Sequence, residues 1–354
     1  MINIIGIGPN RDNITEGALK AISESDVIVG YKKYIDSIED LIDDKEIIKK
    51  GMGDEIARVE LAISKSLEGH KVALISSGDP GVFGMANVLF QILSKYDGLE
   101  VKVYPGVTAT NYAASLLGAP LHDFVAISLS DILTPLEEIE NKIKHAILGE
   151  FIIAIYNPIS KTRKEPFRLF KKLLNELKKP ETPIGIVDST YSPSKVTITT
   201  VNELNEKDIN MSTTLIVGNS LTYIQDSYLI TPRGYVVSKD IHPMAKDFYL
   251  KFLNGSGSSG SNTTCEFYPC HNSSDHQCDF CFCPFYPCGD GSTGGKWIKD
   301  KNVWSCEDCS WIHEKETVDC IKTKLKDILT NVNDLKSKKK QLLKLRRFCL
   351  LNKK

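Results

Sequence analysis

Residues 72–93 constrain the fold of this chain more than any other stretch, because they predict a buried strand, a glycine-rich loop and a helix in immediate succession. The apolar run VALI at 72–75 predicts the strand, and the apolar spacing of 86–93 predicts the helix. Between them, residues 76–86 read SSGDPGVFGMA. Glycine lets the backbone approach a ligand closely, and the first turn of the helix directs its unpaired N–H groups at the loop. An ordinary strand-to-helix turn has a similar composition, so this stretch alone leaves open a binding loop or a plain turn.

Two other predicted strands end in the same kind of turn. Residues 3–6 lead into GIGPN at 6–10, and residues 101–103 lead into YPGVTATN at 104–111. The first turn lacks the G-x-G-x-x-G of dinucleotide-binding folds, whereas Thr108 is placed to cap the helix expected at 108–117. Since ligands bind at the carboxyl ends of strands in an open α/β sheet, we expect the three loops to converge on one cleft.

Residues 1–245 alternate between strand-like and helix-like segments, which predicts an α/β fold. The first half has the pattern of a parallel sheet, and the second half, with fewer helices, has the pattern of a mixed sheet. The expected strands lie at 3–6, 27–29, 72–75, 101–103, 125–127, 151–155, 183–187, 196–200 and 213–217. The expected helices lie at 15–22, 54–67, 86–93, 108–117, 135–147 and 165–177.

Cysteine usage divides the chain. All ten cysteines lie at or after Cys265, and the preceding 264 residues contain none, which indicates a fusion of two unlike parts. Residues 254–261 read NGSGSSGS, which is the composition of a flexible linker. We therefore expect an N-terminal α/β subdomain at 1–118, a second α/β subdomain at 119–245, a linker at 254–262, a cysteine-rich module at 263–320 and a basic helical tail at 321–354.

The spacing of the cysteines is typical of a metal site. C-x2-C pairs occur at 278–281 and 306–309, and His271, His276 and His313 lie among the cysteines. Disulfides are rare in the cytoplasm, so thiolate ligands to tetrahedral zinc or to a [4Fe–4S] cluster are the two interpretations that we favour over buried free cysteines. The expected metal ligands are Cys265, Cys270, Cys278, Cys281, Cys283, Cys288, Cys306, Cys309 and Cys320.

Composition argues against a membrane protein. No apolar run reaches the roughly 20 residues that span a bilayer, and the N-terminus has no basic start, so we expect a cytoplasmic protein. Twelve Lys or Arg against two acids give residues 321–354 a charge of +10, although the whole chain has a net charge of −1. Such a tail either attracts nucleic acid or an acidic partner, or forms a solvated helix against the acidic remainder. We favour the second interpretation, without a nucleic-acid partner.

The three loops resemble those of a known family. GIGPN at 6–10, SSGDPGVFGMA at 76–86 and PGVTATNYAASLLGAPLHDF at 105–124 are similar to the tetrapyrrole methylases of cobalamin biosynthesis. The segments 127–135, 156–163 and 231–235 resemble the branch that contains precorrin-3B C-17 methyltransferase and its anaerobic counterpart, cobalt-factor III methyltransferase. Asn10 and Leu136 depart from that branch, which has glycine and often tryptophan at these places. The module resembles a cysteine-rich small domain found beside cobalamin-pathway proteins.

The resemblance implies a two-domain methylase fold distinct from the Rossmann methyltransferases, a homodimer, S-adenosylmethionine as methyl donor and a corrinoid substrate. It implies C-17 methylation with ring contraction of precorrin-3B, or of cobalt-factor III to give cobalt-precorrin-4. The positions carried over as donor-binding are Gly78, Asp79, Pro80, Phe83, Thr108, Ala109, Asn157, Val187, Gly218 and Asn219. The turn at Gly8 and Pro9 faces the tetrapyrrole in the family, and the candidate partners for its carboxylate arms are Lys161, Arg163 and Arg233.

The implied chemistry asks little of a protein nucleophile. Methyl transfer by in-line displacement uses an electron-rich carbon of the macrocycle, so the protein mainly aligns donor and acceptor. Ring contraction with formation of a lactone needs acid or base assistance. The candidate residues for this step are Ser128, Ser130, Asp131 and His122. Serine and aspartate are also common turn formers, so a structural role is the alternative for these side chains.

Two other functions remain open on the sequence alone. The first is another methylase of the same fold, for a different corrin position or as a diphthine synthase, against which the segments 127–135 and 231–235 argue. The second is a metal- or nucleic-acid-binding protein that acts through the cysteine-rich module and the basic tail. The intact glycine-rich loop at 76–86 argues against that second function.

Overall fold

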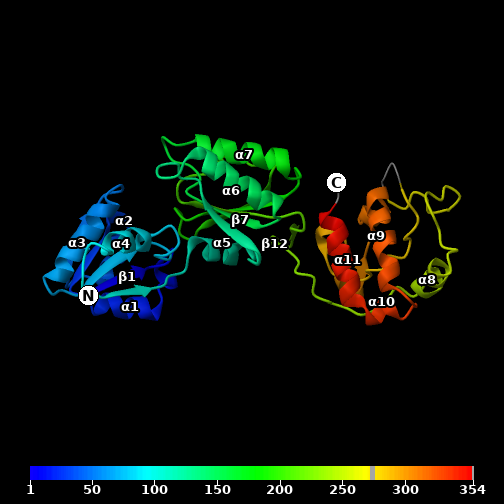
Figure 1. Ribbon diagram of the computed structural model, residues 1–354, viewed down its shortest axis with the longest axis horizontal. Coiled ribbons are helices and arrows are strands. Elements are labelled where there is room, and N and C mark those ends of the chain that lie inside the picture. Colours follow the sequence, from blue (N-terminus) through cyan, green and yellow to red (C-terminus); the bar gives the residue numbers. More distant parts are fainter. Residues whose placement is uncertain (272–275, 353–354) are drawn as a thin grey trace. The chain divides into compact units, whose positions relative to one another are not determined.

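The computed structural model describes residues 1–271 and 276–352. The chain forms two compact units (Figure 1). Unit 1 comprises Met1–Asn219 and Ile224–Leu229, and unit 2 comprises Ser220–Tyr223 and Ile230–Lys354.

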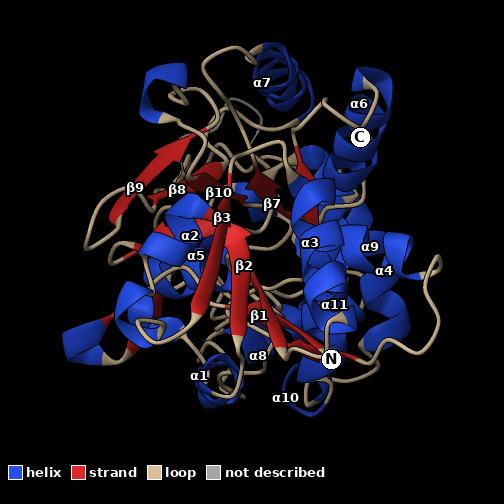
Figure 2. Ribbon diagram, turned by 90° about the vertical axis from the view of Figure 1, so that its left-hand side faces the viewer, coloured by secondary structure: helices blue, strands red, loops and turns tan. Residues whose placement is uncertain are grey.

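Unit 1 begins with a five-stranded parallel sheet in the order β3-β2-β4-β1-β5. Its strands are β1 (Ile2–Gly6), β2 (Val27–Tyr31), β3 (Glu46–Lys50), β4 (Val72–Ser76) and β5 (Val101–Tyr104). Its helices are α1 (Glu16–Ser23), α2 (Lys32–Asp36), α3 (Glu55–Leu67) and α4 (Met85–Leu93). Side chains alternate between two buried faces: Ile4 and Leu74 pack with residues of α3 and α4, whereas Ile5 and Ile75 pack with residues of α1 and α2. Figure 2 shows β2 and β3 side by side in this sheet.

A second five-stranded sheet in unit 1 is mixed, in the order β6-β7-β10-β8-β9. Its strands are β6 (Phe124–Ser128), β7 (Ile152–Tyr156), β8 (Pro183–Asp188), β9 (Lys195–Thr200) and β10 (Thr213–Val217). Strand β10 is antiparallel to both of its neighbours, β7 and β8. Helix α5 (Ala109–Leu117) lies on one face, and α6 (Leu136–Leu148) and α7 (Glu165–Leu177) lie on the other (Figure 1). A hairpin of β11 (Tyr223–Gln225) and β12 (Tyr228–Ile230) follows.

The expected strands and helices of residues 1–245 are confirmed, with shifts of a few residues at their ends. Strands β3, β11 and β12 were not predicted, and neither were the short helix α2 and the start of α8 (Ala245–Leu253). Strand β3 lies at the edge of its sheet and is largely exposed, so it lacks the apolar run that predicts a buried strand.

Unit 2 has one core that joins the cysteine-rich segment to the basic tail. Its further elements are α9 (Lys315–Ile328), α10 (Asp334–Ser337), α11 (Lys339–Leu351), β13 (Lys296–Ile298) and β14 (Val303–Ser305). The apolar residues Leu325, Leu342 and Leu345 belong to one core cluster with Phe280 and Phe285, so the tail packs on the cysteine-rich segment. The physical reason is that an apolar helical stripe needs cover, and the cysteine-rich segment provides it.

Residues 254–262, expected as a linker, lie inside unit 2. The Gly260 amide donates to Asp279 Oδ2 at 2.9 Å, and the Gly260 carbonyl accepts from the Cys278 amide at 2.9 Å. The preceding helix α8 places Ala245 and Tyr249 in the same core. The passage from unit 1 to unit 2 therefore comes before residue 245. Gly257 packs closely on α8, because a Cβ there would lie 3.1 Å from Phe252 Cα.

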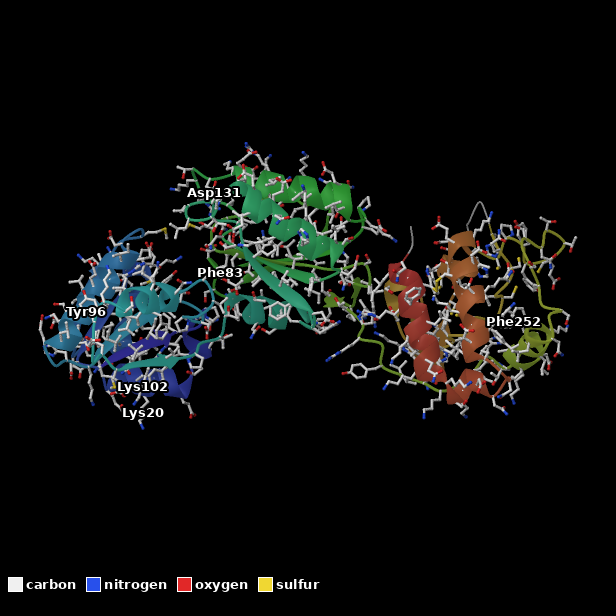
Figure 3. All side chains as sticks on the ribbon, in the orientation of Figure 1. Lys20, Phe83, Tyr96, Lys102, Asp131 and Phe252 are labelled. Carbon is white, nitrogen blue, oxygen red and sulfur yellow. A yellow bond between two sulfur atoms is a disulfide. The ribbon has the colours of Figure 1, made fainter. Side chains whose placement is uncertain are left out.

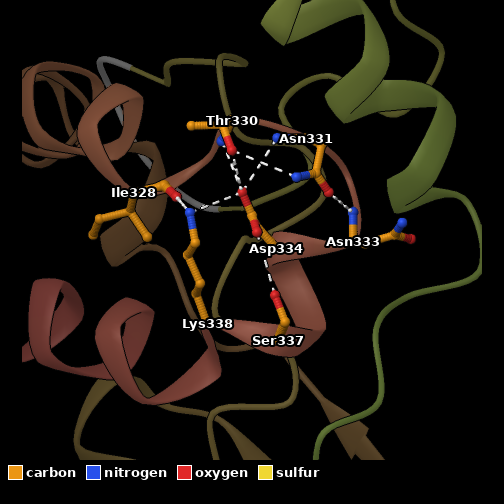
Figure 4. A network of polar contacts seen from close by, with 7 residues as sticks. All are labelled: Ile328, Thr330, Asn331, Asn333, Asp334, Ser337 and Lys338. Atoms are coloured by element: carbon orange, nitrogen blue, oxygen red, sulfur yellow. Dashed lines mark hydrogen bonds and ion pairs between the residues drawn. The ribbon is translucent and has the colours of Figure 1, made fainter.

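A polar network closes the connection from α9 to α11 (Figure 4). The Thr330 and Asn331 amides donate to Asp334 Oδ2 at 2.9 and 3.2 Å, and Lys338 Nζ lies 3.0 Å from the same oxygen. The Thr330 amide, foremost among these partners, holds the pKa of Asp334 well below its usual range. The ionised carboxylate thus anchors the turn that brings α11 onto the core.

Candidate functional site

The three glycine-rich loops of unit 1 meet at the carboxyl edge of the first sheet, as the sequence predicts. They follow β1, β4 and β5, and β1 lies between the other two strands. Gly8 and Gly78 exchange two backbone hydrogen bonds, of 3.1 and 3.0 Å. Both glycines have positive φ, +66° and +60°, which other residues adopt only with strain.

The loop that follows β5 approaches the other two loops so closely that a side chain cannot fit. A Cβ atom on Gly106 would lie 2.1 Å from the Gly78 carbonyl oxygen and 2.8 Å from the Gly6 backbone. Asp79 completes the junction: its Oδ1 accepts from the Gly81 amide at 2.8 Å and its Oδ2 from the Gly106 amide at 3.1 Å. Asp79, expected as a direct donor contact, therefore also joins two of the loops.

Tyr156, at the end of β7, links this loop cluster to the second sheet. Its hydroxyl lies 2.6 Å from Thr108 Oγ1, 2.6 Å from Thr110 Oγ1 and 3.0 Å from the Thr110 amide nitrogen. Thr108 is the N-cap residue of α5, but its side chain bonds to Tyr156 rather than to the helix. Phe83, labelled in Figure 3, is 54% exposed. The centroid of its ring lies 4.9 Å from that of Tyr156. Tyr156 was not among the predicted site residues, because an aromatic residue ending a strand is usually a core residue.

A second polar cluster lies at the carboxyl ends of β6 and β7. Ser128 Oγ accepts from Asn157 Nδ2 at 3.0 Å and from the Ser130 amide at 3.2 Å. Arg163 Nη1 donates to the carbonyls of Leu129 at 2.5 Å and Asn157 at 3.0 Å. Arg163 Nε also lies 3.6 Å from Asp131 Oδ1.

Arg163, which we expected to bind a substrate carboxylate, lies among backbone groups of its own turn and of the neighbouring loop. Its side chain is only 11% exposed, and its hydrogen bonds go to backbone carbonyls. It therefore holds the turn after β7 against the loop after β6. Lys161, in the same turn, is exposed, whereas Arg233 is an exposed residue of unit 2.

Three predicted site residues lie away from these clusters. His122 precedes β6, and Ser128 is the last residue of that strand. The two residues therefore lie at opposite ends of β6, whose four residue-to-residue rises are about 3.3 Å each. Gly218 and Asn219 follow β10, and the Gly218 amide bonds to the Pro183 carbonyl, which stands at the start of β8. Because β10 is antiparallel to β7 and β8, its carboxyl end lies at the opposite edge of the sheet from Asn157. The remaining donor positions, Pro80, Ala109 and Val187, are placed on the glycine-rich loop, at the start of α5 and near the end of β8.

A further link between the sheets was not anticipated. Asn10 Nδ2 donates to the Tyr112 hydroxyl at 3.2 Å, and that hydroxyl lies 3.1 Å from Ser194 Oγ. Asn10 departs from the family pattern, and here it takes part in binding the first loop to α5 and to the loop before β9. No local sequence signal identifies such a contact.

In unit 2, eight cysteines are free and two form a disulfide. Cys320, expected as a metal ligand, is bonded to Cys349, so it is not available to a metal. The two residues are 29 positions apart, and they come together because α9 packs against α11. This bond corrects both the metal assignment of Cys320 and the expectation that the chain lacks disulfides.

The free cysteines influence one another in two separate sets. Burial, and then the thiolates of Cys278, Cys270 and Cys265, raise the pKa of Cys281 to about 11. Burial, and then the thiolates of Cys288, Cys309 and Cys306, raise the pKa of Cys283 well above its usual value. Thiolates held so close repel one another, and a bound cation removes that repulsion.

Two histidines border the first set. Cys270 Sγ lies 3.2 Å from His276 Nε2, and atoms of Cys270, His276 and His313 that can bind a metal lie within 4.8 Å of one another. His313 Nδ1 lies 2.7 Å from the Gln277 carbonyl oxygen, and burial lowers the pKa of His313 to about 4. A neutral imidazole held through Nδ1 presents Nε2 as a ligand, so these histidines are candidate ligands that the cysteine spacing did not identify.

Two α/β sheets, joined through a glycine-rich loop cluster and followed by a cysteine-rich unit, define the class to which this protein belongs. Residues 1–205 match the family described as tetrapyrrole (corrin/porphyrin) methylases, and residues 257–336 match the family described as a cysteine-rich small domain. The chain belongs to the tetrapyrrole methylases and is a methyltransferase, which confirms the predicted family and fold class.

Among its relatives is a probable cobalt-factor III C(17)-methyltransferase of Methanothermobacter thermautotrophicus, 57% identical over 351 residues, with 99% of each chain covered. Another relative, the probable cobalt-factor III C(17)-methyltransferase of Salmonella typhimurium, is 43% identical over 241 residues, which are 67% of this chain and 100% of that protein. A crystal structure of the methyltransferase CobJ superposes with a TM-score of 0.63 at 34% identity, covering 65% of this chain and 99% of CobJ. Within the described residues, no helix has the length and apolar character needed to cross a membrane.

Proposed function

We propose that this chain transfers a methyl group from S-adenosylmethionine to C-17 of cobalt-factor III, with ring contraction, in cobalamin biosynthesis. The observation that carries the proposal is the 57% identity to a probable cobalt-factor III C(17)-methyltransferase along nearly the whole of both chains. The names of the relatives favour the cobalt-containing substrate over precorrin-3B. The family resemblance implies a homodimer, and from the sequence composition we expect a cytoplasmic protein.

The loop cluster is the place for the methyl donor. S-adenosylmethionine, when bound, supplies an electrophilic methyl group on a cationic sulfur. The Asp79 carboxylate at the loop junction suits the positive groups of such a donor, and the N-terminus of α5 suits its carboxylate. The backbone comes close to this donor site at Gly78, Gly106 and Thr108. Aromatic surface for the donor is provided by Phe83 and Tyr156.

The cluster at Ser128 suits the ring contraction. A hydroxyl group has one hydrogen to donate and two lone pairs to accept. Ser128 Oγ already accepts from Asn157 Nδ2 and from the Ser130 amide, so its hydrogen remains for an acceptor on the substrate. Arg163 keeps Asn157 and the loop 128–131 in place, which orients that donor without entering the reaction.

The test is a reaction with S-adenosylmethionine and either cobalt-factor III or precorrin-3B under anaerobic conditions, followed by mass spectrometry. We expect S-adenosylhomocysteine and a corrinoid heavier by one methyl group with the cobalt substrate, and slower turnover with precorrin-3B. Methylation of neither substrate, with donor binding intact by calorimetry, would contradict the assignment and point to another corrin position.

We further propose that the cysteine-rich segment binds metal through its thiolates. Free cysteines of this number, in C-x2-C and C-x4-C pairs, match zinc or [4Fe–4S] ligation. The full length of the Salmonella relative aligns with only 67% of this chain. The metal is therefore an addition to the methylase and not part of the methyl-transfer chemistry. Metal analysis and visible absorbance after anaerobic purification distinguish zinc from iron, and a metal-free chain would contradict the proposal.

A further inference from the structure

The cysteine-rich segment contains one motif twice. Residues 265–270 read CEFYPC and residues 283–288 read CPFYPC, so five of the six positions are identical and only the second differs. Each copy is followed by a C-x2-C pair whose second residue is acidic, CDFC at 278–281 and CEDC at 306–309. The eight free cysteines therefore fall into two equivalent sets of four.

The two copies also fold alike. In the first copy the Tyr268 amide donates to the Cys265 carbonyl at 3.0 Å, and in the second the Tyr286 amide donates to the Cys283 carbonyl at 3.2 Å. In each C-x2-C pair the second cysteine contacts the backbone carbonyl of the first. In 278–281 the contact is made by the thiol, with Cys281 Sγ 3.2 Å from the Cys278 carbonyl oxygen. In 306–309 it is made by the backbone, with the Cys309 amide donating to the Cys306 carbonyl at 3.0 Å. A repeated sequence with repeated turns indicates a repeated use.

The second set lies around a cavity. Cys283, Cys288, Cys306 and Cys309 all line a cavity of about 480 Å³, together with Trp304, Trp311 and Arg346. The same four cysteines belong to the core of unit 2 or pack against it. The cavity also receives Cys270 and Cys281 from the first set. Cysteines of both sets thus face a common space, and their sulfur atoms are the polar groups that a soft metal binds.

Two buried cations accompany the second set. Lys339 is 2% exposed, and its Nζ donates to the carbonyls of Phe285, at 2.9 Å, and of Tyr286, both between Cys283 and Cys288. Arg346 is 4% exposed, lines the cavity and forms an ion pair with Asp290. Lysine is rarely buried without a negative partner, and within the described residues the carboxylate that acts on Lys339, that of Asp240, does so from beyond ion-pair distance. Four thiolates on a divalent zinc ion or on a [4Fe–4S] cluster carry net negative charge, which supplies the missing partner.

We propose that the cysteine-rich unit holds two metal centres, one for each copy of the motif, and that each centre has four cysteine ligands. The first centre uses Cys265, Cys270, Cys278 and Cys281, and the second uses Cys283, Cys288, Cys306 and Cys309. Cys320 and Cys349 take no part, because they are bonded to each other. The metal is a thiophilic one, zinc or iron–sulfur. His276, whose Nε2 lies 3.2 Å from Cys270 Sγ, is the competing candidate ligand at the first centre, and His276→Ala tests it.

This inference rests on the proposed metal binding and refines it, so the experiment must separate the two. The full chain is purified anaerobically, and native mass spectrometry of the intact protein counts the bound ions or clusters. We expect two centres per chain. A chain without metal would overturn the metal binding itself, whereas a single centre would overturn only the duplication. S-adenosylhomocysteine formation, assayed in parallel, reports on the methylase alone.

Paired variants assign the ligands. We expect C265S/C270S and C283S/C288S each to keep half of the wild-type metal, measured by elemental analysis, and C320S/C349S to keep all of it. Lys339→Met should weaken metal retention at the second centre only. Loss of all metal from either set of paired ligand variants, with α-helical circular dichroism unchanged, would refute two independent centres. Loss of the first centre in His276→Ala would replace the four-cysteine assignment there with a mixed one. Native mass spectrometry of the wild type needs no variant, so misfolding of a variant leaves the count decisive.

Discussion

The hydroxyl of Tyr156 joins the two sheets of unit 1, and its removal provides a sharp test of the site. Tyr156→Phe deletes one oxygen and leaves the aromatic ring, so the contact with Phe83, at 4.9 Å between ring centroids, is retained. The lost oxygen lies within 3.0 Å of Thr108 Oγ1, Thr110 Oγ1 and the Thr110 amide nitrogen. At about 1 kcal/mol for each net hydrogen bond, unit 1 should lose roughly 2–4 kcal/mol of unfolding free energy.

The same substitution should weaken donor binding. Thr108 and Thr110 stand at the start of α5, so loss of their common partner loosens the helix terminus that we assign to the donor carboxylate. A loss of about 1.4 kcal/mol corresponds to a tenfold weaker affinity for S-adenosylmethionine, which isothermal titration calorimetry measures directly.

The assay must report on unit 1. All three tryptophans, Trp297, Trp304 and Trp311, lie in unit 2, so tryptophan fluorescence follows unit 2 alone. The urea transition that far-ultraviolet circular dichroism detects and tryptophan fluorescence does not is the unfolding of unit 1. Tyr191→Phe, at an exposed position, is the matched control and should change neither stability nor affinity. If Tyr156→Phe unfolds within about 0.5 kcal/mol of the wild type and binds the donor equally well, the hydroxyl does not organise the site.

Four further predictions test the remaining parts of the site and of unit 2. Asp79→Ala removes the acceptor shared by the Gly81 and Gly106 amides, so donor affinity should fall at least roughly tenfold in calorimetry while the fold persists; an unchanged affinity would contradict this role. Gly106→Ala places a Cβ 2.1 Å from the Gly78 carbonyl oxygen and should lower the free energy of unfolding by roughly 3 kcal/mol or more. The control Gly17→Ala in α1, where the nearest atom is 3.7 Å away, should raise it by up to about 1 kcal/mol. Equal melting temperatures of the two variants would refute the close packing. Ser128→Ala should slow formation of the ring-contracted product by roughly a hundredfold and leave donor affinity unchanged, and retention of the full rate would exclude the hydroxyl as a proton donor. Because folding lowers the pKa of Asp334, its carboxylate stabilises the folded protein fully above the unfolded pKa of about 3.9, and this stabilisation is lost as the pH falls below that value. Asp334→Asn should remove this part of the acid dependence of urea unfolding. An unchanged dependence would speak against the network.

The sequence by itself determined the α/β pattern and the convergence of the three loops. Apolar runs locate strands such as β4, and glycine with proline marks the turns. The carboxyl ends of parallel strands share one edge of a sheet, so the loops at Gly8, Gly78 and Gly106 had to meet once the strands were recognised as parallel. The cysteine step at Cys265 likewise marked the second component of the chain.

The tertiary structure alone decided strand direction and long-range pairing. A strand has the same side-chain period in either direction, so nothing in 213–217 shows that β10 runs antiparallel and carries Gly218 and Asn219 to the far edge. Spacing reports on neighbours in sequence, and Cys320 meets Cys349 only because two helices pack together. A lysine in a basic tail is ordinarily solvated, yet packing of α11 buries Lys339 beside the second set of cysteines. Local chemistry thus specified which residues are capable of forming a site, and the packing of distant segments specified which of them meet.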